Sequence, residues 1–209
     1  MEKEKKKKNI ETELDTTRDE LANSLAESLN KSSDAGKIAF FLYAQDDPSQ
    51  ILDWVSTGND ILDLAISNRA HGGVPGGRIT ELTGLEASGK SLLAAHLLAT
   101  TQKNGGLAVF IDTEYAVSPE FLTAIGVDIS KMLYINVTTV EDIFDNIESI
   151  VAQIRKLNKN RLVTIVVDSM AAASTRKEMA SDHGADGYAT GKAIAISKAM
   201  RKITELIAK

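Results

Sequence analysis

The fold is decided by the stretch Arg78-Ile-Thr-Glu-Leu-Thr-Gly84-Leu-Glu-Ala-Ser-Gly89-Lys90-Ser91, which contains a full match to the pattern G-x-x-x-x-G-K-[ST]. Before the match, Ile79 and Leu82 predict a short buried strand. After it, the leucines and alanines between Leu92 and Ala99 predict a helix. Such a pattern between a strand and a helix is typical of a loop that binds phosphate groups.

The residue types in this loop match the chemistry of phosphate binding. Gly84 and Gly89 let the backbone approach a phosphate without a Cβ in the way, and their N–H groups point inward. The N-terminus of the following helix adds a partial positive charge. Lys90 is expected to reach the β- and γ-phosphates, and Ser91 to ligate Mg²⁺. The predicted nucleotide-binding residues are Gly84, Leu85, Glu86, Ala87, Ser88, Gly89, Lys90 and Ser91.

The composition narrows the class of protein. The chain has 209 residues, of which 43% are hydrophobic and 25% charged, as expected for a globular protein with one sizeable core. The net charge of −5 means that any contact with nucleic acid needs a local basic surface. The absence of cysteine excludes disulfides and thiolate metal sites and favours the reducing cytoplasm. No apolar run is long enough to span a membrane, and no signal-like segment follows the charged start.

The sequence pattern divides the chain into three parts. Residues 1–9 are a lysine-rich run that we expect to be a disordered basic tail. Residues 10–37 are expected to form an amphipathic helix and a polar linker, with the helix packed on its own core or on a neighbouring subunit. Residues 38–209 are expected to form the core domain.

Within residues 38–209, stretches typical of strands alternate with stretches typical of helices. Strands are predicted at 38–43, 51–55, 107–111, 132–137 and 162–167, and helices at 59–66, 118–126, 140–157 and 189–208, besides the helix after the phosphate loop. This alternation predicts a three-layer α/β domain with a mainly parallel sheet. The polar connection at 169–188 is long, and such segments are usually functional or disordered.

Acidic residues follow two of the predicted strands. Asp168 comes directly after the apolar run Val163-Thr-Ile-Val-Val167, which is typical of a Walker B motif, so we expect it to hold Mg²⁺ with Ser91. Asp112 and Glu114 follow another strand, and either carboxylate could act as general base on water. Residues two apart on a strand point to the same face, so spacing does not choose between them.

In combination, these motifs resemble those of the RecA recombinases of bacteria and, more closely, their phage-encoded relatives. The resemblance runs from Ile38 onward. It rests on Ser56-Thr-Gly58, Gly72-Gly-Val-Pro-Gly-Gly-Arg-Ile-Thr-Glu81, Gly84-Leu-Glu-Ala-Ser-Gly-Lys-Ser91, Phe110-Ile-Asp-Thr-Glu114, Val166-Val-Asp-Ser169 and Ser197-Lys-Ala-Met-Arg-Lys-Ile203. The phosphate loop alone would not be specific for this family, whereas the combination is.

The resemblance implies an ATP- and Mg²⁺-dependent enzyme with a RecA-type core. Glu114 falls on the family's catalytic glutamate, which activates water, and Lys90 is the second catalytic position. Asp168 falls on the Walker B aspartate. Phe121 falls where a tyrosine usually stacks on adenine, and Ser118 where an aspartate often contacts it, so looser base selectivity is expected.

The resemblance also implies DNA binding and assembly. Residues 177–188 correspond to the first DNA-binding loop, although the sequence departs from the bacterial pattern there, and Arg201 falls on a position that faces DNA phosphate. The helix in 10–37 resembles in kind the family's protomer-linking helix. The implied function is a cytoplasmic recombinase that forms helical homo-oligomeric filaments on single-stranded DNA and promotes homologous pairing and strand exchange. The implied DNA-binding residues are Arg176, Lys177, Lys192 and Arg201.

One departure from the family pattern concerns the end of the sequence at Lys209. In the family, a strand with a γ-phosphate-sensing polar residue follows, then the second DNA loop and further strands. We therefore expect the N-terminal part of such a recombinase, with weak stability or dependence on a partner because a sheet edge is left open. Two other functions stay open from sequence: a different RecA-fold DNA-dependent ATPase, such as a helicase, and a truncated non-catalytic partner of a recombinase filament.

Overall fold

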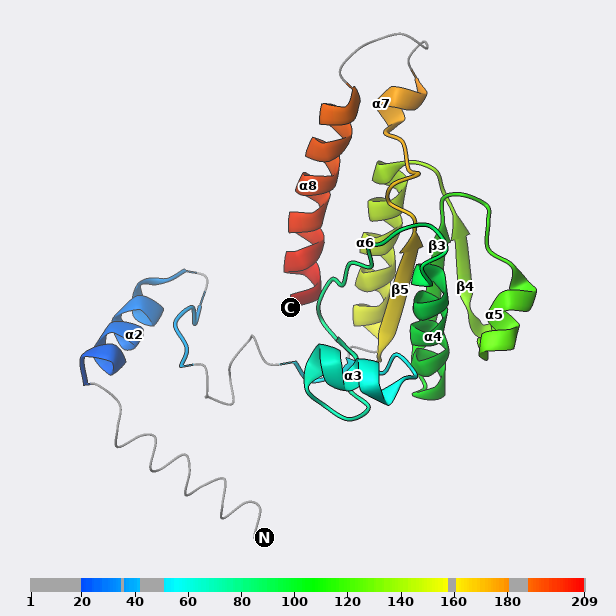
Figure 1. The fold of residues 1–209 in the computed structure, drawn as a ribbon. Coiled ribbons are helices and arrows are strands. Elements are labelled where there is room, and N and C mark those ends of the chain that lie inside the picture. Colours follow the sequence, from blue (N-terminus) through cyan, green and yellow to red (C-terminus); the bar gives the residue numbers. More distant parts are fainter. Residues whose placement is uncertain (1–19, 35, 42–50, 158–160, 181–187, 209) are drawn as a thin grey trace. The chain divides into compact units, whose positions relative to one another are not determined.

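The computed structural model of the chain describes residues 20–34, 36–41, 51–157, 161–180 and 188–208 (Figure 1). The chain forms two compact units, Met1–Gln50 and Ile51–Lys209. The predicted basic tail at 1–9 and the first part of the predicted helix lie outside the described residues, as does most of the segment predicted as the first DNA-binding loop. Among the described residues, no helix combines the length and apolar character needed to cross a bilayer.

The first unit contains helix α2 (Glu20–Ser32), whose last turns are tied to the segment that follows. Asn30 makes this link: its Oδ1 accepts hydrogen bonds from the N–H groups of Ile38 and Ala39, both at 2.7 Å, and its Nδ2 donates to the carbonyl of Ala39. The helix lies in the predicted interval. The strand predicted at 38–43 is wrong for residues 38–41, because Asn30 takes up backbone groups that a strand would use in a ladder.

The second unit is built on a three-stranded parallel sheet in the order β4–β3–β5. The strands are β3 (Leu107–Asp112), β4 (Leu133–Asn136) and β5 (Val163–Asp168). The register sets Asp112 beside Asn136 on one side and beside Asp168 on the other. The carboxyl ends of all three strands therefore present polar side chains at one edge of the sheet, the usual place for a ligand in such folds.

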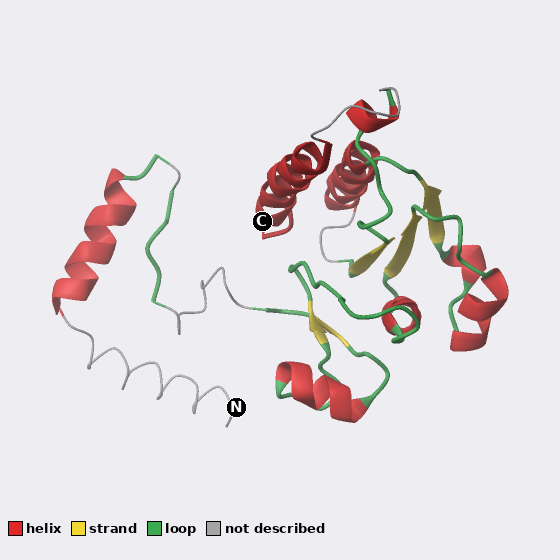
Figure 2. Cartoon of the chain, turned by 45° about the horizontal axis from the view of Figure 1, so that its top comes forward, coloured by secondary structure: helices red, strands yellow, loops and turns green. Residues whose placement is uncertain are grey.

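Helices cover both faces of this sheet (Figure 2). On one face lie α4 (Lys90–Lys103) and α5 (Pro119–Ile125), and on the other α6 (Val140–Leu157) and α8 (Tyr188–Ala208). Alternate residues of β3 divide between the layers: Phe110 packs with α4 and α5, and Ile111 with α6 and α8. The predicted three-layer α/β fold with a parallel sheet is confirmed, and both faces of β3 are buried as its apolar sequence indicates.

A smaller antiparallel ladder precedes the sheet in sequence. It joins β1 (Trp54–Val55) to β2 (Val74–Pro75), and the connection contains α3 (Asp60–Ser67). Gly73 makes the return possible, because it has a φ of +77° and a Cβ there would lie 2.2 Å from the carbonyl oxygen of Val55. The short 3-10 turn η1 (Ile129–Lys131) and helix α7 (Arg176–Met179) complete the described elements.

The strand predicted before the phosphate loop is not present. Residues 79–84 pair with no described strand, and Ile79 is 42% exposed rather than buried. A strand exists only where a neighbour supplies ladder hydrogen bonds, and β5 is paired through β3 alone among the described residues. The phosphate loop is contacted by Lys90, the first residue of α4, which donates to the carbonyls of Gly84 and Leu85.

Candidate nucleotide-binding and hydrolysis site

The loop of residues 84–89 ends directly at the N-terminus of α4 and turns sharply. Ala87 and Gly89 have positive φ angles of 56° and 91°, and the N–H of Ser88 donates to the carbonyl of Leu85 at 3.3 Å. No described side chain caps α4, so the N–H groups of its first turn remain for an anionic group. A loop in which right-handed and left-handed backbone conformations alternate directs its N–H groups toward a common centre, and this arrangement suits a bound phosphate.

Lys90 lies over this loop. Its Nζ donates to the carbonyl of Gly84 at 3.0 Å and to that of Leu85 at 2.7 Å. The ammonium group is thus held by the loop's own backbone, at the place where a bound phosphate would need a cation. A phosphate oxygen is a stronger partner for the ammonium than a neutral carbonyl, so the lysine can exchange one for the other.

Ser91 and Asp168 come together from α4 and the end of β5. The Oγ of Ser91 donates to Oδ2 of Asp168 at 2.7 Å, although the residues are far apart in sequence. A hydroxyl and a carboxylate are oxygen ligands of the kind that Mg²⁺ takes, with water and phosphate oxygens filling the rest of its octahedron. The pair therefore fits the predicted metal site.

Asp112, at the end of β3, is almost fully buried, with 2% of its surface exposed. Its Oδ1 accepts from the N–H groups of Glu114 and Tyr115, both at 2.9 Å, and its Oδ2 accepts from the N–H of Val117 at 3.2 Å and the hydroxyl of Tyr134 at 3.0 Å. Burial alone would raise the pKa of Asp112, but these hydrogen bonds outweigh it and hold the pKa below its ordinary value.

Glu114 differs from Asp112 in being exposed. Its Oε1 accepts a hydrogen bond from the Oγ of Ser169 at 2.8 Å. Ser169 is itself fixed by Thr113, whose Oγ1 donates to the Ser169 carbonyl at 2.8 Å and accepts from the Ser169 N–H at 2.9 Å. Sequence reasoning did not single out Thr113 and Ser169, which the structure joins to the site by these hydrogen bonds; the signal was their position directly beside Glu114 and Asp168.

A cavity of about 220 Å³ brings five of the predicted residues together. Ser91, Glu114 and Asp168 line it, and so do Ser118, the N-cap of α5, and Phe121 within that helix. Phe121 is 40% exposed, so its ring is available to a stacking partner. The loop residues from Gly84 to Lys90 do not line this cavity, whereas Ser91, the next residue in sequence, does.

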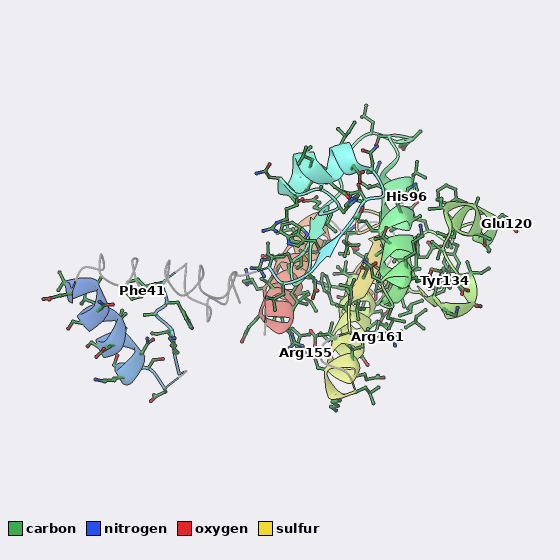
Figure 3. The ribbon with its side chains drawn as sticks, turned by 90° about the horizontal axis from the view of Figure 1, so that it is seen from below. Phe41, His96, Glu120, Tyr134, Arg155 and Arg161 are labelled. Atoms are coloured by element: carbon green, nitrogen blue, oxygen red, sulfur yellow. The ribbon has the colours of Figure 1, made fainter. Side chains whose placement is uncertain are left out.

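The hydroxyl of Ser118 is already engaged at the start of α5. It accepts from the N–H of Phe121 at 3.2 Å as the N-cap, and it donates to Oε2 of Glu120, which lies on the outer side of α5 (Figure 3). The hydrogen bond from Ser118 lowers the pKa of Glu120. The Ser118 hydroxyl therefore caps α5, and a hydrogen bond from it to the nucleobase of a bound nucleotide would compete with this cap.

The predicted DNA-binding residues do not form one surface. Arg176, on α7, donates to Asp142 at 2.5 Å and to Asp145 at 2.8 Å, both on α6, and these carboxylates raise its pKa. Lys177 is exposed and makes no ion pair with a described residue. Arg176 is thus neutralised locally, whereas Lys177 keeps its charge for solvent or phosphate.

The two remaining cations project from different sides of α8. Lys192 donates to the carbonyl of Ala171 at 2.7 Å, and Arg201 to the hydroxyl of Ser197 at 3.0 Å. At about 100° per residue, their separation in sequence places them on opposite sides of the helix. Lys192 reaches toward the segment after β5, and Arg201 stays exposed on the outer side.

Comparison with known proteins identifies close similarity to one family. A family model described as the RecA N-terminal domain matches residues 21–209. The RecA protein of Leptospira biflexa is 34% identical over 209 residues, which cover 100% of this chain and 51% of that protein. The RecA protein of Arthrospira platensis is 36% identical over 90% of this chain and 47% of its own length. The chain therefore spans about half the length of the curated relatives that it matches.

Proposed function

We infer the function from one premise: the chain belongs to the RecA family. We propose that it is the N-terminal part of a cytoplasmic, ATP-dependent DNA recombinase that forms filaments on single-stranded DNA and promotes homologous pairing and strand exchange. In this proposal residues 10–37 carry the protomer contact and residues 38–209 the ATPase core. The observation that carries the proposal is the meeting of Ser91, Asp168 and Glu114 at one cavity.

Each residue of the site has a distinct role in the proposed hydrolysis. The N–H groups of the loop and α4 would bind the phosphates of ATP, and Lys90 would move from the loop carbonyls to the phosphate oxygens. Ser91 and Asp168 would hold Mg²⁺, which when bound helps to neutralise the phosphate charge. Ser118 and Phe121 would line the base pocket, with the Phe121 ring stacking on adenine.

Glu114 is the proposed general base. Its carboxylate is exposed and lines the cavity, so it can accept a proton from a water there. Asp112 is unsuited to this task because both of its oxygens already accept hydrogen bonds and it is buried. The hydroxyl of Ser169 would hold the Glu114 carboxylate toward the reacting water.

The proposed DNA contacts are electrostatic and independent of sequence. Lys177 and Arg201 are the cations best placed to meet phosphates, because both are exposed and neither has a carboxylate partner among the described residues. Lys192 and Arg176 begin from contacts within the protein and would contribute only after releasing them. The exposed leucines of α2 support the proposed contact between copies of the chain in the filament.

The test of this proposal uses Lys90→Ala and Glu114→Gln in the 209-residue chain. Lys90→Ala should weaken binding of a fluorescent ATP analogue by at least tenfold, because the loop loses its cation. Glu114→Gln should bind the analogue like the parent and lose hydrolysis by about 100-fold, since general bases contribute 10²–10⁴-fold. Hydrolysis is measured with and without single-stranded DNA. A Gln variant that hydrolyses ATP at the parental rate would refute the assignment of the base.

A further inference from the structure

The buried carboxylate of Asp112 is organised around the loop that carries Glu114. Three of its four hydrogen-bond donors are backbone N–H groups of that loop, from Glu114, Tyr115 and Val117. The fourth is the hydroxyl of Tyr134 on β4. No cation pairs with Asp112 among the described residues, so hydrogen bonds alone hold its charge. The first of these donors in sequence is the N–H of Glu114, the proposed general base.

The loop needs such an anchor because its backbone is strained. Tyr115 has a φ of +58°, in the left-handed region that a residue with a bulky side chain rarely adopts. Its side chain does not compensate by packing, since it is 71% exposed. The hydrogen bond from the Tyr115 N–H to Asp112 is therefore a contact that stabilises this conformation.

Geometry connects this anchor to the cavity. Asp112 and Phe110 lie on the face of β3 that packs against α4 and α5, and the register sets Asp112 beside Asp168. The loop leaves the sheet at this point, and both Glu114 and Val117 line the cavity. Fixing the N–H groups at 114 and 117 on one carboxylate fixes both ends of the segment that faces the cavity.

We propose that Asp112 is a positioning residue for hydrolysis: it holds residues 113–117 so that the Glu114 carboxylate faces the cavity shared with Ser91 and Asp168. This inference rests on the proposed role of Glu114 as base. Asp112 holds the backbone of Glu114, and Ser169 holds its carboxylate. Asp112 also lines the cavity, but both of its oxygens already accept hydrogen bonds, so in this proposal it takes no proton in the reaction.

The variant that tests this role is Asp112→Asn. It keeps the size of the side chain but turns one oxygen into an NH₂ group, which then faces either the Val117 N–H or the N–H pair of Glu114 and Tyr115. A donor opposite a backbone donor cannot bind it, so one end of the loop is released. The control is Tyr134→Phe, which removes the donor from β4 and leaves all three loop contacts.

The kinetic readout separates positioning from general stability. Asp112→Asn should lower kcat for ATP by about 10- to 100-fold, because misplacing a catalytic group by roughly 1 Å costs on the order of 10²-fold, and leave KM within about threefold. Tyr134→Phe should keep kcat within about threefold. In the Glu114→Gln background, adding Asp112→Asn should lower the residual rate no further, since Asp112 acts through Glu114. A further loss there, or a parental kcat for Asp112→Asn, overturns the proposal.

Hydrogen exchange provides a readout that needs no turnover. In Asp112→Asn the amides at the released end of the loop, either Val117 or Glu114 and Tyr115, should exchange at least tenfold faster than in the parent, whereas those of β3 should be unchanged. Unchanged exchange in the loop overturns the proposal. Asp112→Glu serves if the Asn variant does not fold, because it keeps the charge and displaces the carboxylate by one methylene; the same kinetic outcomes apply. Parental hydrolysis by Glu114→Gln would instead identify the proposed base as the error.

Discussion

Replacing Asp63 by Ala should destabilise the second unit more than any other single carboxylate change on α3. Asp63 is completely buried, and its carboxylate accepts hydrogen bonds from the N–H of Thr57 at 2.8 Å, the Oγ1 of Thr57 at 2.6 Å and the Oγ of Ser56. It thereby holds the chain after β1 to the helix. Burial would raise the pKa of Asp63, but the hydrogen bonds from Ser56 and Thr57 outweigh it and lower the pKa.

The magnitude follows from what each donor loses. The buried N–H of Thr57 is left without an acceptor, which costs about 1–3 kcal/mol. The Oγ1 of Thr57 keeps a weaker acceptor in the Asn59 carbonyl at 3.3 Å, and Ser56 is only partly buried, so we assign each about 0.5–1 kcal/mol. The sum is about 2–5 kcal/mol, which lowers Tm by roughly 5–15 °C for a chain of this size.

The assay is urea unfolding followed by the fluorescence of Trp54, the single tryptophan, which lies in β1 two residues before Ser56. The matched control is Asp60→Ala on the same helix. Asp60 pairs with His71, but both side chains are more than two-thirds exposed, so its loss should cost less than about 1 kcal/mol. Equal losses of unfolding free energy in the two variants would refute the reasoning.

The pH dependence of the unfolding free energy provides a second test of the same prediction. Because the folded-state pKa of Asp63 lies below its ordinary value near 3.8, its ionisation stabilises the fold above that value. This contribution is lost as pH falls through the lowered folded-state pKa. The difference in unfolding free energy between the parent and Asp63→Asn should therefore be constant near neutral pH and shrink below about pH 4.

Three further predictions concern the site and its supports. Ser91→Ala should raise the Mg²⁺ concentration that half-saturates ATP hydrolysis by about tenfold, measured by magnesium titration, because one of two protein oxygens is lost; an unchanged titration would contradict the assigned ligand. Lys177→Ala should reduce the salt slope of single-stranded DNA binding by about 0.7, whereas Arg176→Ala should leave it nearly unchanged, since two carboxylates already neutralise the guanidinium; fluorescence anisotropy across NaCl concentrations decides, and equal slopes would refute the distinction. Gln102→Ala should lower Tm by about 3–8 °C in a thermal melt, because its amide makes hydrogen bonds of 2.8 and 2.9 Å to the backbone of Asp128 at net values near 1 kcal/mol each; an unchanged Tm would contradict it.

The features that the sequence predicts best are those set by neighbours in the chain. Ser118 and Pro119 predict the start of α5 and Gly126 its end, and the structure has the Ser118 cap, the proline in the first turn and Gly126 as the C-cap. The helix after the phosphate loop follows in the same way from a local pattern. In each case the determining contacts span a few residues, so the pattern contains them.

The errors occur where the determining partner is distant. Residues 38–41 and 79–82 have strand-like composition, but a strand depends on a ladder with another segment, and none of the described segments supplies one. Helix α3 is a different case: it begins and ends within one residue of the predicted 59–66, yet Ile61 is 82% exposed and the completely buried residue is Asp63. Hydrophobicity ranks side chains for burial, but it does not register that Ser56 and Thr57 offer three donors to a carboxylate.

The choice between Asp112 and Glu114 shows how a backbone detail decides chemistry. The rule that residues two apart share a face holds only within a strand, and β3 ends at Asp112. Beyond it the loop turns back so that its N–H groups bind the Asp112 carboxylate, which removes that carboxylate from reaction and leaves the Glu114 carboxylate exposed. In the proposed mechanism the two acids therefore have different roles: the hydrogen bonds from the loop lower the pKa of the buried Asp112 carboxylate, which orders that loop, and the exposed Glu114 carboxylate accepts the proton. Two carboxylates at this spacing are then expected to divide into anchor and base wherever the strand ends at the first of them.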